Sequence, residues 1–250
     1  MGSEEMLVND QVPQPSLTIL IPVFNEGATL ASLLDAVEAQ TAIVSQIVIV
    51  DDASTDATAQ ILAERSATIP TTIVRHPTNR GKGAAIRTGI ECATGDYLLI
   101  QDADLEYAPD DYSRLLEPIM AGRAHVVYGT RSFGGHAAFS FWFVMGNKMV
   151  TLATNILFNA YITDMETCFK LLPLPMWRSL DLRANRFGVE PEVTGKLLSR
   201  GERIFEVPIS YSARTRTEGK KLTWTDGLRA LGVLLAVRTG AWDTVSRKAS

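Results

Sequence analysis

Two aspartates, Asp102 and Asp104, stand one residue apart directly after the apolar run over 97–100. Side chains two residues apart on an extended chain point to the same face, and in a turn they can converge on one cation. Hard divalent ions such as Mg²⁺ and Mn²⁺ prefer carboxylate and phosphate oxygens as ligands. The pair therefore indicates either a metal site that neutralises a phosphate group or a solvated turn.

Acidic residues also follow two other apolar runs. Glu26 comes after the run over 17–23, and Asp52 comes after the run over 47–50. Short apolar runs that alternate with helical patterns predict β-α-β units and a mainly parallel sheet. Because the carboxyl ends of parallel strands lie at one edge of a sheet, we expect the three carboxylate-bearing loops to converge.

The strand and helix patterns alternate regularly in the first half and less regularly in the second. Predicted strands cover residues 17–23, 47–50, 72–74, 97–100, 126–128, 168–172 and 204–209. Predicted helices cover residues 30–37, 83–92, 112–119, 138–158, 192–198 and a final stretch from Thr225. A further helix, with Ile61 and Leu62 on its inner face, is expected after Ser54, whose hydroxyl can cap it.

Composition limits the class of protein. The chain has 250 residues, of which 46% are apolar and 21% are charged, as in a globular protein. A net charge of −4 argues against a surface that binds nucleic acid. Cys92 and Cys168 match no zinc spacing, which favours a reducing, cytoplasmic setting. No run approaches the roughly 20 apolar residues of a membrane-spanning helix.

Five short segments, taken together and in order, resemble the inverting glycosyltransferases of family two. They are Ile21–Glu26, Val48–Asp56, Asn79–Gly83, Gln101–Asp104 and Gly129–Arg131. Within that family the chain most resembles the dolichol-phosphate mannose synthases and the bacterial polyprenyl-phosphate glycosyltransferases. The resemblance implies a GT-A-like (Rossmann-like) α/β fold with a mainly parallel central sheet. We expect a flexible leader over 1–15, a GT-A domain over 16–222 and an amphipathic helix with a basic tail over 223–250.

The resemblance implies a site for a nucleotide-sugar donor. The expected donor-binding residues are Pro22, Phe24, Glu26, Val50, Asp52, Lys82, Asp102, Ala103, Asp104, Arg131, Arg214, Lys220 and Lys221. Pro22, Phe24 and Glu26 would line the pocket for base and ribose, and Asp52 would contact the base or ribose. Lys82, in a loop between two glycines, would approach a phosphate or remain a surface lysine. Arg131 would contact a phosphate bidentately.

The same resemblance assigns the metal and catalytic groups. Both aspartates of the Asp102–Asp104 segment would bind Mg²⁺ or Mn²⁺, and Glu106 would add a third carboxylate. The expected catalytic residues are Asp104, Asp164 and Arg131. Arg214 together with Lys220 or Lys221 would close over the phosphates, and the choice of lysine stays open because this loop is one residue longer than in the family.

The segment over 163–170 resembles the family's acceptor-side motif. Asp164 would orient the sugar or the acceptor, with a turn-forming role as the alternative. Glu190 and Glu192 could reach the site, although N-terminal capping of a helix is their favoured role. An acceptor phosphate is already an anion near neutral pH, so a strong general base is not required.

Two amphipathic stretches suggest contact with a membrane surface, or else ordinary core-facing helices. The first contains Phe139, Phe141, Trp142, Phe143, Met145 and Met149, with Lys148 and Arg131 nearby. The second contains Trp224, Leu228, Leu231, Leu235 and Trp242, with Arg229, Arg238, Arg247 and Lys248. A membrane-anchoring partner protein is also conceivable.

These features predict an enzyme at the cytoplasmic face of a membrane that transfers a hexose to a polyprenyl or dolichyl phosphate. Mannose from GDP-mannose is the favoured donor sugar, and UDP-glucose is second. One alternative is a family-two transferase with a soluble or polysaccharide acceptor, although the Gln-x-x-Arg-Trp signature of processive synthases is absent. Others are a sugar-phosphate nucleotidyltransferase, which would carry a glycine-rich loop after the first strand, and a non-catalytic binding module.

Overall fold

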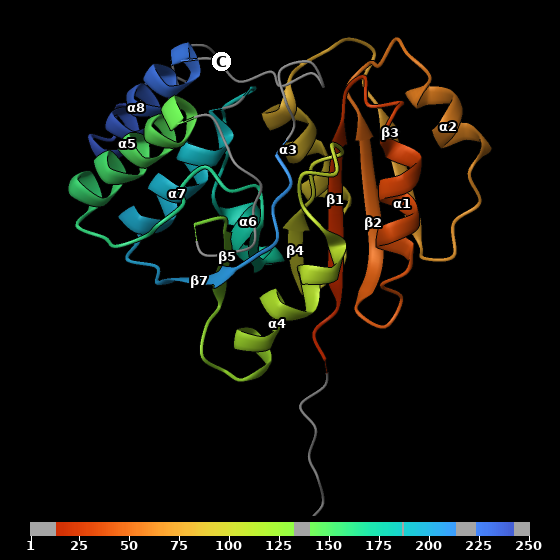
Figure 1. Cartoon of the computed structure of the whole chain (residues 1–250), viewed down its shortest axis with the longest axis horizontal. Helices are drawn as coiled ribbons and strands as arrows, with labels where there is room; N and C mark the ends of the chain where they lie inside the picture. Colours follow the sequence, from red (N-terminus) through yellow and green to blue (C-terminus); the bar gives the residue numbers. More distant parts are fainter. Residues whose placement is uncertain (1–13, 133–140, 187, 214–223, 243–250) are drawn as a thin grey trace, which may run out of the picture.

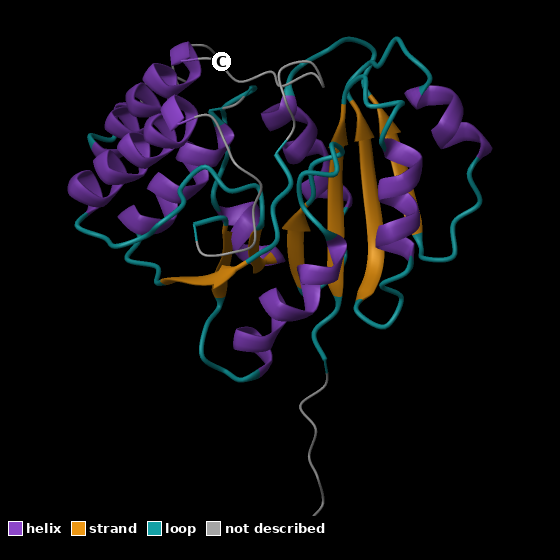
Figure 2. Cartoon of the chain, in the orientation of Figure 1, coloured by secondary structure: helices purple, strands orange, loops and turns teal. Residues whose placement is uncertain are grey.

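A computed structural model describes residues 14–132, 141–186, 188–213 and 224–242 of the chain, with helices packed around one central sheet (Figures 1 and 2). The sheet has seven strands in the order β3-β2-β1-β4-β6-β5-β7. They are β1 (Leu17–Val23), β2 (Val44–Asp51), β3 (Thr71–Arg75), β4 (Tyr97–Ile100), β5 (Val126–Thr130), β6 (Lys170–Pro173) and β7 (Ile204–Pro208). All seven strands were predicted, with ends that differ by a few residues.

The sheet is mainly parallel, as predicted, with one reversed strand. β1 pairs in parallel with β2 and β4, β2 with β3, and β5 with β7. β6 runs antiparallel to both of its neighbours, β4 and β5. The segment before β6 lies at the carboxyl ends of β4 and β5, where Cys168 N donates to Tyr107 Oη at 3.1 Å. A strand that enters the sheet from that edge must run antiparallel to β4 and β5. The sequence pattern did not predict this direction.

The described helices lie close to their predicted positions. They are α1 (Leu30–Glu38), α2 (Thr58–Glu64), α3 (Lys82–Cys92), α4 (Tyr112–Met120), α5 (Phe141–Phe158), α6 (Leu174–Ser179), α7 (Val189–Ser199) and α8 (Trp224–Arg238), with a short 3₁₀ helix, η1, at Pro109–Asp111. α6 and η1 were not predicted. α3 packs against β1 and β2, whereas α5, α7 and α8 pack on one another beside the sheet (Figure 1).

The predicted cap of α2 is wrong. The helix begins at Thr58 without a side-chain cap, and the Ser54 hydroxyl accepts a hydrogen bond from Asn25 N at 3.0 Å instead. Asp56 Oδ1 accepts from Thr58 N at 3.0 Å at the start of the helix. Ser54 therefore links the loops after β1 and β2, and Asp56 accepts a hydrogen bond at the start of α2 in its place.

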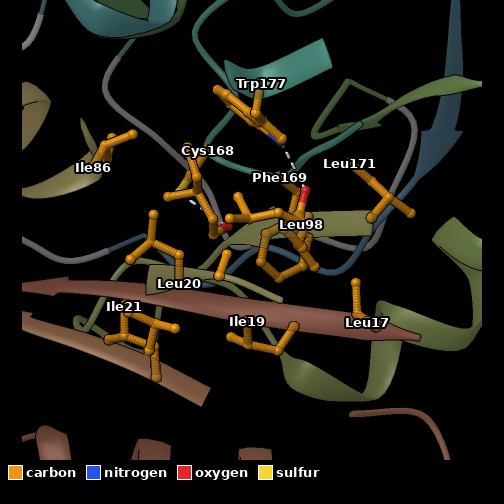
Figure 3. Close-up of a cluster of buried hydrophobic side chains, with 14 of the residues drawn as sticks. Leu17, Ile19, Leu20, Ile21, Ile86, Leu98, Cys168, Phe169, Leu171 and Trp177 are labelled. Atoms are coloured by element: carbon orange, nitrogen blue, oxygen red, sulfur yellow. Dashed lines mark hydrogen bonds between the residues drawn. The ribbon is translucent and has the colours of Figure 1, made fainter. Parts of the chain in front are cut away.

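The main core lies around β1, whose side chains pack from both faces, as its unbroken apolar run predicts. Figure 3 shows β1 side chains facing Leu98 and Leu171, with Trp177 Nε1 donating to Leu98 O at 3.0 Å. A second, smaller core joins α5 and α8 and contains Val150, Ile162, Met165, Ala230 and Leu234. Among the described residues, no helix is long and apolar enough to cross a membrane.

Candidate active site

The loops after β1, β2 and β4 meet at one edge of the sheet, which confirms the predicted convergence. Asn25 N in the first loop donates to Ser54 Oγ in the second at 3.0 Å. Thr29 Oγ1, just before α1, donates to Ala103 O in the third loop at 2.8 Å. The three loops are thus hydrogen-bonded to one another, and their acidic residues share one edge.

Each of these loops contains a non-glycine residue with positive φ. The φ angles are 54° at Asn25, 64° at Ala53 and 60° at Leu105. Side chains with a Cβ rarely adopt this left-handed backbone, and such conformations cluster at functional sites, where the surrounding structure holds them. Backbone conformations that are typical of functional sites therefore occur at the same sheet edge as the carboxylates.

Asp52 is buried and shapes the neighbouring loop. Its Oδ1 lies 2.6 Å from His76 Nδ1 and accepts from Arg80 N at 2.9 Å, while Oδ2 accepts from Gly81 N at 2.6 Å. The other ring nitrogen of His76 lies 3.0 Å from Thr88 Oγ1. His76 was missed by the sequence analysis, although a histidine directly after β3 was a signal. Contact of Asp52 with a base or ribose stays a prediction.

Lys82 is the first residue of α3, so the expectation that it sits in a loop is wrong. Its Nζ lies 2.7 Å from Asp102 Oδ1 and 2.7 Å from Glu190 Oε1. Burial on its own would lower the pKa of this lysine, but the charges of Asp102 and Glu190 outweigh burial and raise the pKa well above its ordinary value. Lys82 therefore stays positively charged between two carboxylates.

Two glycines let the start of α3 approach another segment closely. A Cβ at Gly81 would collide with the carbonyl oxygen of Asn185, and one at Gly83 with that of Ala184. Gly83 N donates to Asn185 O at 3.1 Å, which fixes the contact. The two glycines around Lys82 thus permit close backbone packing, rather than the loop flexibility that the sequence suggested.

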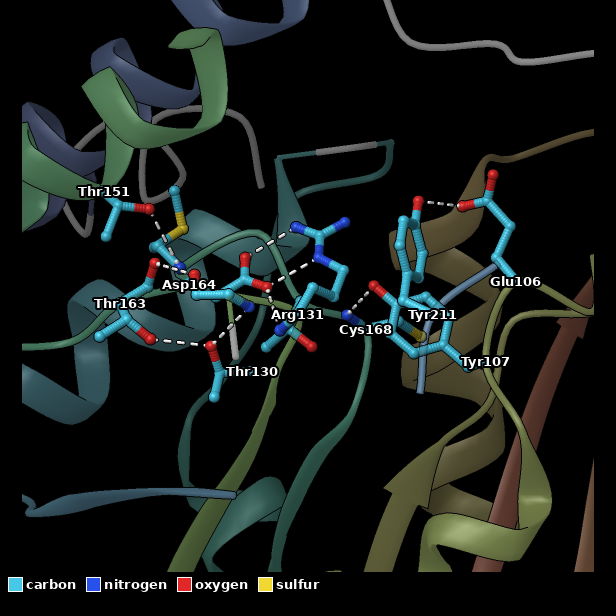
Figure 4. A network of polar contacts seen from close by, with 12 residues as sticks. Glu106, Tyr107, Thr130, Arg131, Thr151, Thr163, Asp164, Cys168 and Tyr211 are labelled. Carbon is cyan, nitrogen blue, oxygen red and sulfur yellow. Dashed lines mark hydrogen bonds and ion pairs between the residues drawn. The ribbon is translucent and has the colours of Figure 1, made fainter. Parts of the chain in front are cut away.

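The three predicted metal ligands do not gather in one cluster. Asp104 Oδ1 accepts from Glu106 N at 3.1 Å, and Glu106 Oε2 accepts from Tyr211 Oη at 2.6 Å (Figure 4). Within the described part of the chain, no group of three or more histidine, cysteine or acidic side chains could hold a metal ion. Asp102 and Asp104 still fit a hard cation in chemical type, and the Lys82 ammonium already lies against Asp102.

The remaining predicted donor residues divide by exposure. Val50 and Ala103 are 0% and 4% exposed, so their side chains lie in the core. Phe24 is 36% exposed, and Pro22 and Glu26 are partly buried at the same edge. An aromatic side chain and a carboxylate therefore lie at the end of β1, whereas Val50 and Ala103 could offer a donor only their backbone.

Arg131 and Asp164 form a buried, bidentate ion pair (Figure 4). Nε and Nη2 of Arg131 each lie 2.7 Å from an oxygen of Asp164, and Arg131 N donates to the same carboxylate at 3.0 Å. The guanidinium also lies 5.1 Å from the ring centroid of Tyr211, within the range of a cation–π contact. The bidentate face expected for a phosphate is thus directed at Asp164. A phosphate contact by Arg131 stays a prediction and would not use the same two nitrogens.

Glu190 and Glu192 do not cap α7, whose first turn has no side-chain cap. Glu192 is fully buried and accepts from Ala184 N at 2.8 Å, from Lys196 Nζ at 2.7 Å and from Trp242 Nε1 at 2.7 Å. Glu190 Oε1 pairs with Lys82, whereas its Oε2 is buried and has no hydrogen-bond partner in the described structure. The capping prediction is wrong because both carboxylates reach other segments of the chain.

The acceptor-side segment over 163–170 is held along its length. Glu206 Oε1 accepts from Thr163 N at 2.8 Å and from Asp164 N at 3.1 Å. Lys170 Nζ donates back to the carbonyl of Met165 at 2.8 Å. Burial, reinforced by the charge of Glu190, raises the pKa of Glu166 to about 7, against the opposing effect of Lys170. Glu166, which the sequence analysis did not single out, is therefore a carboxyl that titrates near neutral pH.

Some predicted residues fall outside the described part of the chain. These are Arg214, Lys220 and Lys221 of the basic loop, together with Phe139, Arg247, Lys248 and nearly all of the 1–15 leader. Two residues expected at the amphipathic surfaces turn inward instead: Arg131 pairs with Asp164, and Trp242 bonds to Glu192.

Comparison with known proteins identifies the class of enzyme. Residues 18–172 match the family described as Glycosyl transferase family 2, and the chain belongs to this family. It is a glycosyltransferase with a GT-A α/β fold. A crystal structure of glucosyl-3-phosphoglycerate synthase from Mycobacterium tuberculosis, in complex with Mn²⁺ and uridine diphosphate, covers 90% of this chain and 80% of its own with a TM-score of 0.68. At 19% identity, that likeness concerns the fold.

Several curated relatives with named activities are similar to this chain over most of its length. The undecaprenyl-phosphate mannosyltransferase of Micrococcus luteus is 31% identical and covers 80% of this chain and 85% of its own. The low-salt glycan biosynthesis hexosyltransferase Agl6 of Haloferax volcanii is 27% identical over 96% of this chain. The dolichol-phosphate mannosyltransferase of Pyrococcus furiosus is 26% identical over 82% of this chain. The chain spans 58% of the length of each of the last two.

Proposed function

We propose that this glycosyltransferase moves a hexose from a nucleoside diphosphate sugar to a polyprenyl phosphate at the cytoplasmic face of a membrane, with a divalent cation bound at Asp102 and Asp104. Mannose from GDP-mannose is the favoured donor, and UDP-glucose is second. The observation that carries the proposal is the position of these two aspartates after β4, at the edge that they share with the loops after β1 and β2.

The proposed reaction is an in-line displacement that inverts the anomeric carbon. An oxygen of the acceptor phosphate forms the new bond to that carbon, and the bond to the donor diphosphate breaks with its electron pair leaving on the diphosphate. A Mg²⁺ or Mn²⁺ ion, when bound, supplies positive charge to the leaving diphosphate. Lys82 adds a protein cation beside Asp102, and Phe24 with Glu26 would hold the base and ribose.

Two observations support a lipid-linked acceptor. The Micrococcus and Pyrococcus relatives carry undecaprenyl phosphate and dolichol phosphate in their names. In addition, α5 and α8 pack side by side and expose large apolar side chains, namely Phe141, Met149, Leu152, Ile156, Leu228 and Leu235, which are between 50% and 72% exposed. Arg229 and Arg238 lie on the same helix pair and are exposed, as expected for a surface that meets anionic lipid.

The test offers the purified full chain radiolabelled GDP-mannose or UDP-glucose, with Mg²⁺ or Mn²⁺ and a short polyprenyl phosphate. Label is expected in the organic phase with the phosphate acceptor and not with the matching polyprenol, which lacks the phosphate. Label that enters only a water-soluble acceptor would overturn the lipid proposal, while leaving the family assignment intact.

A further inference from the structure

The Lys82 ammonium joins carboxylates from the two halves of the proposed site: a donor half, formed by the loops after β1, β2 and β4, and an acceptor half, formed by Arg131, the segment over 163–170 and the start of α7. Its Nζ lies 2.7 and 3.0 Å from the two oxygens of Asp102, after β4, and 2.7 Å from Glu190 Oε1, in the first turn of α7. The three side chains are 15%, 23% and 10% exposed respectively. One lysine thus pairs both with Asp102, a proposed metal ligand, and with Glu190, which has no assigned role.

The backbone around Lys82 is fixed, so only its side chain is free to move. Gly81 N donates to Asp52 Oδ2 at 2.6 Å, and Gly83 N donates to Asn185 O at 3.1 Å. These two bonds hold the residues on either side of the lysine. The lysine stem has four flexible carbons and carries its charge at one point, so its ammonium can change partner without any change in the backbone.

The charges at this point conflict with a metal ion. A divalent cation on Asp102 would lie beside the Lys82 ammonium, and two like charges at such short range repel strongly in a partly buried site. Glu190 offers the lysine an alternative, because its Oε2 is buried and has no hydrogen-bond partner within the described ranges. A buried, unpaired carboxylate oxygen is costly, and a second contact from the ammonium would remove that cost.

We propose that Lys82 is the resident counter-ion of Asp102, that a divalent cation displaces it, and that Glu190 positions the displaced lysine. The inference rests on the metal site of the proposed function. Without metal, the lysine neutralises Asp102. With metal, the lysine leaves Asp102 but remains on Glu190, beside the place where the donor diphosphate would bind. Glu190 is thus a positioning residue that links the acceptor half to the donor half.

The experiment measures binding of Mn²⁺ alone to the full chain, without donor or lipid, from the signal of free Mn²⁺ in electron paramagnetic resonance. Lys82→Met is expected to tighten Mn²⁺ binding about fivefold or more, because it removes a competing cation. Lys82→Arg keeps the positive charge and should stay near the wild-type affinity. Lys148→Met, the same substitution on an exposed face of α5, serves as the control and should change nothing.

A double-mutant cycle tests the role of Glu190. Glu190→Gln should weaken Mn²⁺ binding when Lys82 is present, because the lysine then has only Asp102 as a partner. The same change should have no effect in the Lys82→Met background. An equal weakening in both backgrounds would mean that Glu190 acts on the metal through its own charge, which would overturn its positioning role.

A further variant separates this inference from the metal assignment. If Asp102→Asn leaves Mn²⁺ binding unchanged, the proposed metal site is wrong and the counter-ion role falls with it. If Asp102→Asn abolishes binding but Lys82→Met does not tighten it, the metal site stands and the counter-ion role alone is overturned.

Discussion

The proposed donor half and the proposed acceptor half of the site hold their charged groups by different means. At the donor edge, Asp52 accepts from backbone N–H groups of the loop before α3, while Asp102 and Asp104 remain partly exposed. In the acceptor half, Arg131 and Asp164 are buried against each other, 13% and 6% exposed. Asp52 is thus held by loop backbone as well as by His76, and Asp102 by Lys82, whereas Arg131 and Asp164 are held chiefly by each other.

The difference has an energetic consequence. Removing one member of a buried ion pair leaves an uncompensated charge in a poorly solvated place, whereas replacing the partly exposed Asp104 by its amide keeps the oxygen that accepts from Glu106 N. We therefore expect substitutions in the acceptor half to affect stability first, and substitutions at the donor edge to affect the rate first.

Arg131→Met should have the largest effect. Loss of the guanidinium leaves Asp164 buried and unpaired, so the free energy of unfolding is expected to fall by about 3–5 kcal/mol. Urea denaturation at pH 7.5 measures this loss. The matched control is Arg229→Met, which breaks an exposed pair with Asp226 and should cost about 1 kcal/mol or less. Equal losses in the two variants would remove the energetic distinction between the halves.

Asp104→Asn should separate rate from stability at the donor edge. The amide keeps an oxygen that can accept from Glu106 N, so the free energy of unfolding should change by about 0.5 kcal/mol or less. If Asp104 holds the cation as proposed, the turnover number should fall about 100-fold, because positive charge on the leaving diphosphate is lost. Label transfer with saturating donor measures it. Asp35→Asn, at a site 74% exposed on α1, is the control and should retain wild-type turnover.

Ile156→Ser tests the exposed apolar face of α5 and α8, which the proposed function places against a membrane. Ile156 is 72% exposed on α5, and its burial in the headgroup region should contribute enough that the serine variant binds anionic liposomes about tenfold more weakly. Sedimentation with liposomes measures the binding. Ile73→Ser, on β3 and 48% exposed, is the matched control. If both variants lose the same liposome affinity, the membrane contact is not specific to α5 and α8.

Glu166→Gln should have an effect that is visible as a dependence of stability on pH. Because the folded pKa of Glu166 is raised to about 7, the folded state binds this proton more tightly than the unfolded chain. The resulting stabilisation is present below the ordinary carboxyl pKa and is lost as pH rises towards 7. The wild type should therefore lose stability relative to the variant between pH 5 and pH 7.5 in urea titrations. A difference that does not vary with pH would contradict the raised pKa.

The sequence predicts the donor edge well because that edge follows from local patterns. Apolar runs that end in Glu26, Asp52 and Asp102 are enough to predict parallel strands and a shared rim. The partners of the charged side chains could not be predicted in the same way. Lys82 meets Glu190 from a helix 108 positions further along the chain, and no periodicity encodes that contact.

Two errors have the same physical origin. Ser54 and Glu190 were both assigned to nearby helix ends, because capping is a local role that a sequence pattern suggests. In the structure each bonds to a distant segment, Ser54 to Asn25 and Glu190 to Lys82. The antiparallel direction of β6 was also not predicted, because it depends on where the preceding segment enters the sheet.

The strand order has a consequence for how the chain is made. The strands β3, β2, β1 and β4 all come from residues 17–100, so during synthesis they can pair before the rest of the chain exists. The outer edge of β4 stays unpaired until β6 is synthesised. An unpaired strand edge is prone to form hydrogen bonds with other chains. Strands β3, β2, β1 and β4 can therefore be paired while the outer edge of β4 is still uncovered.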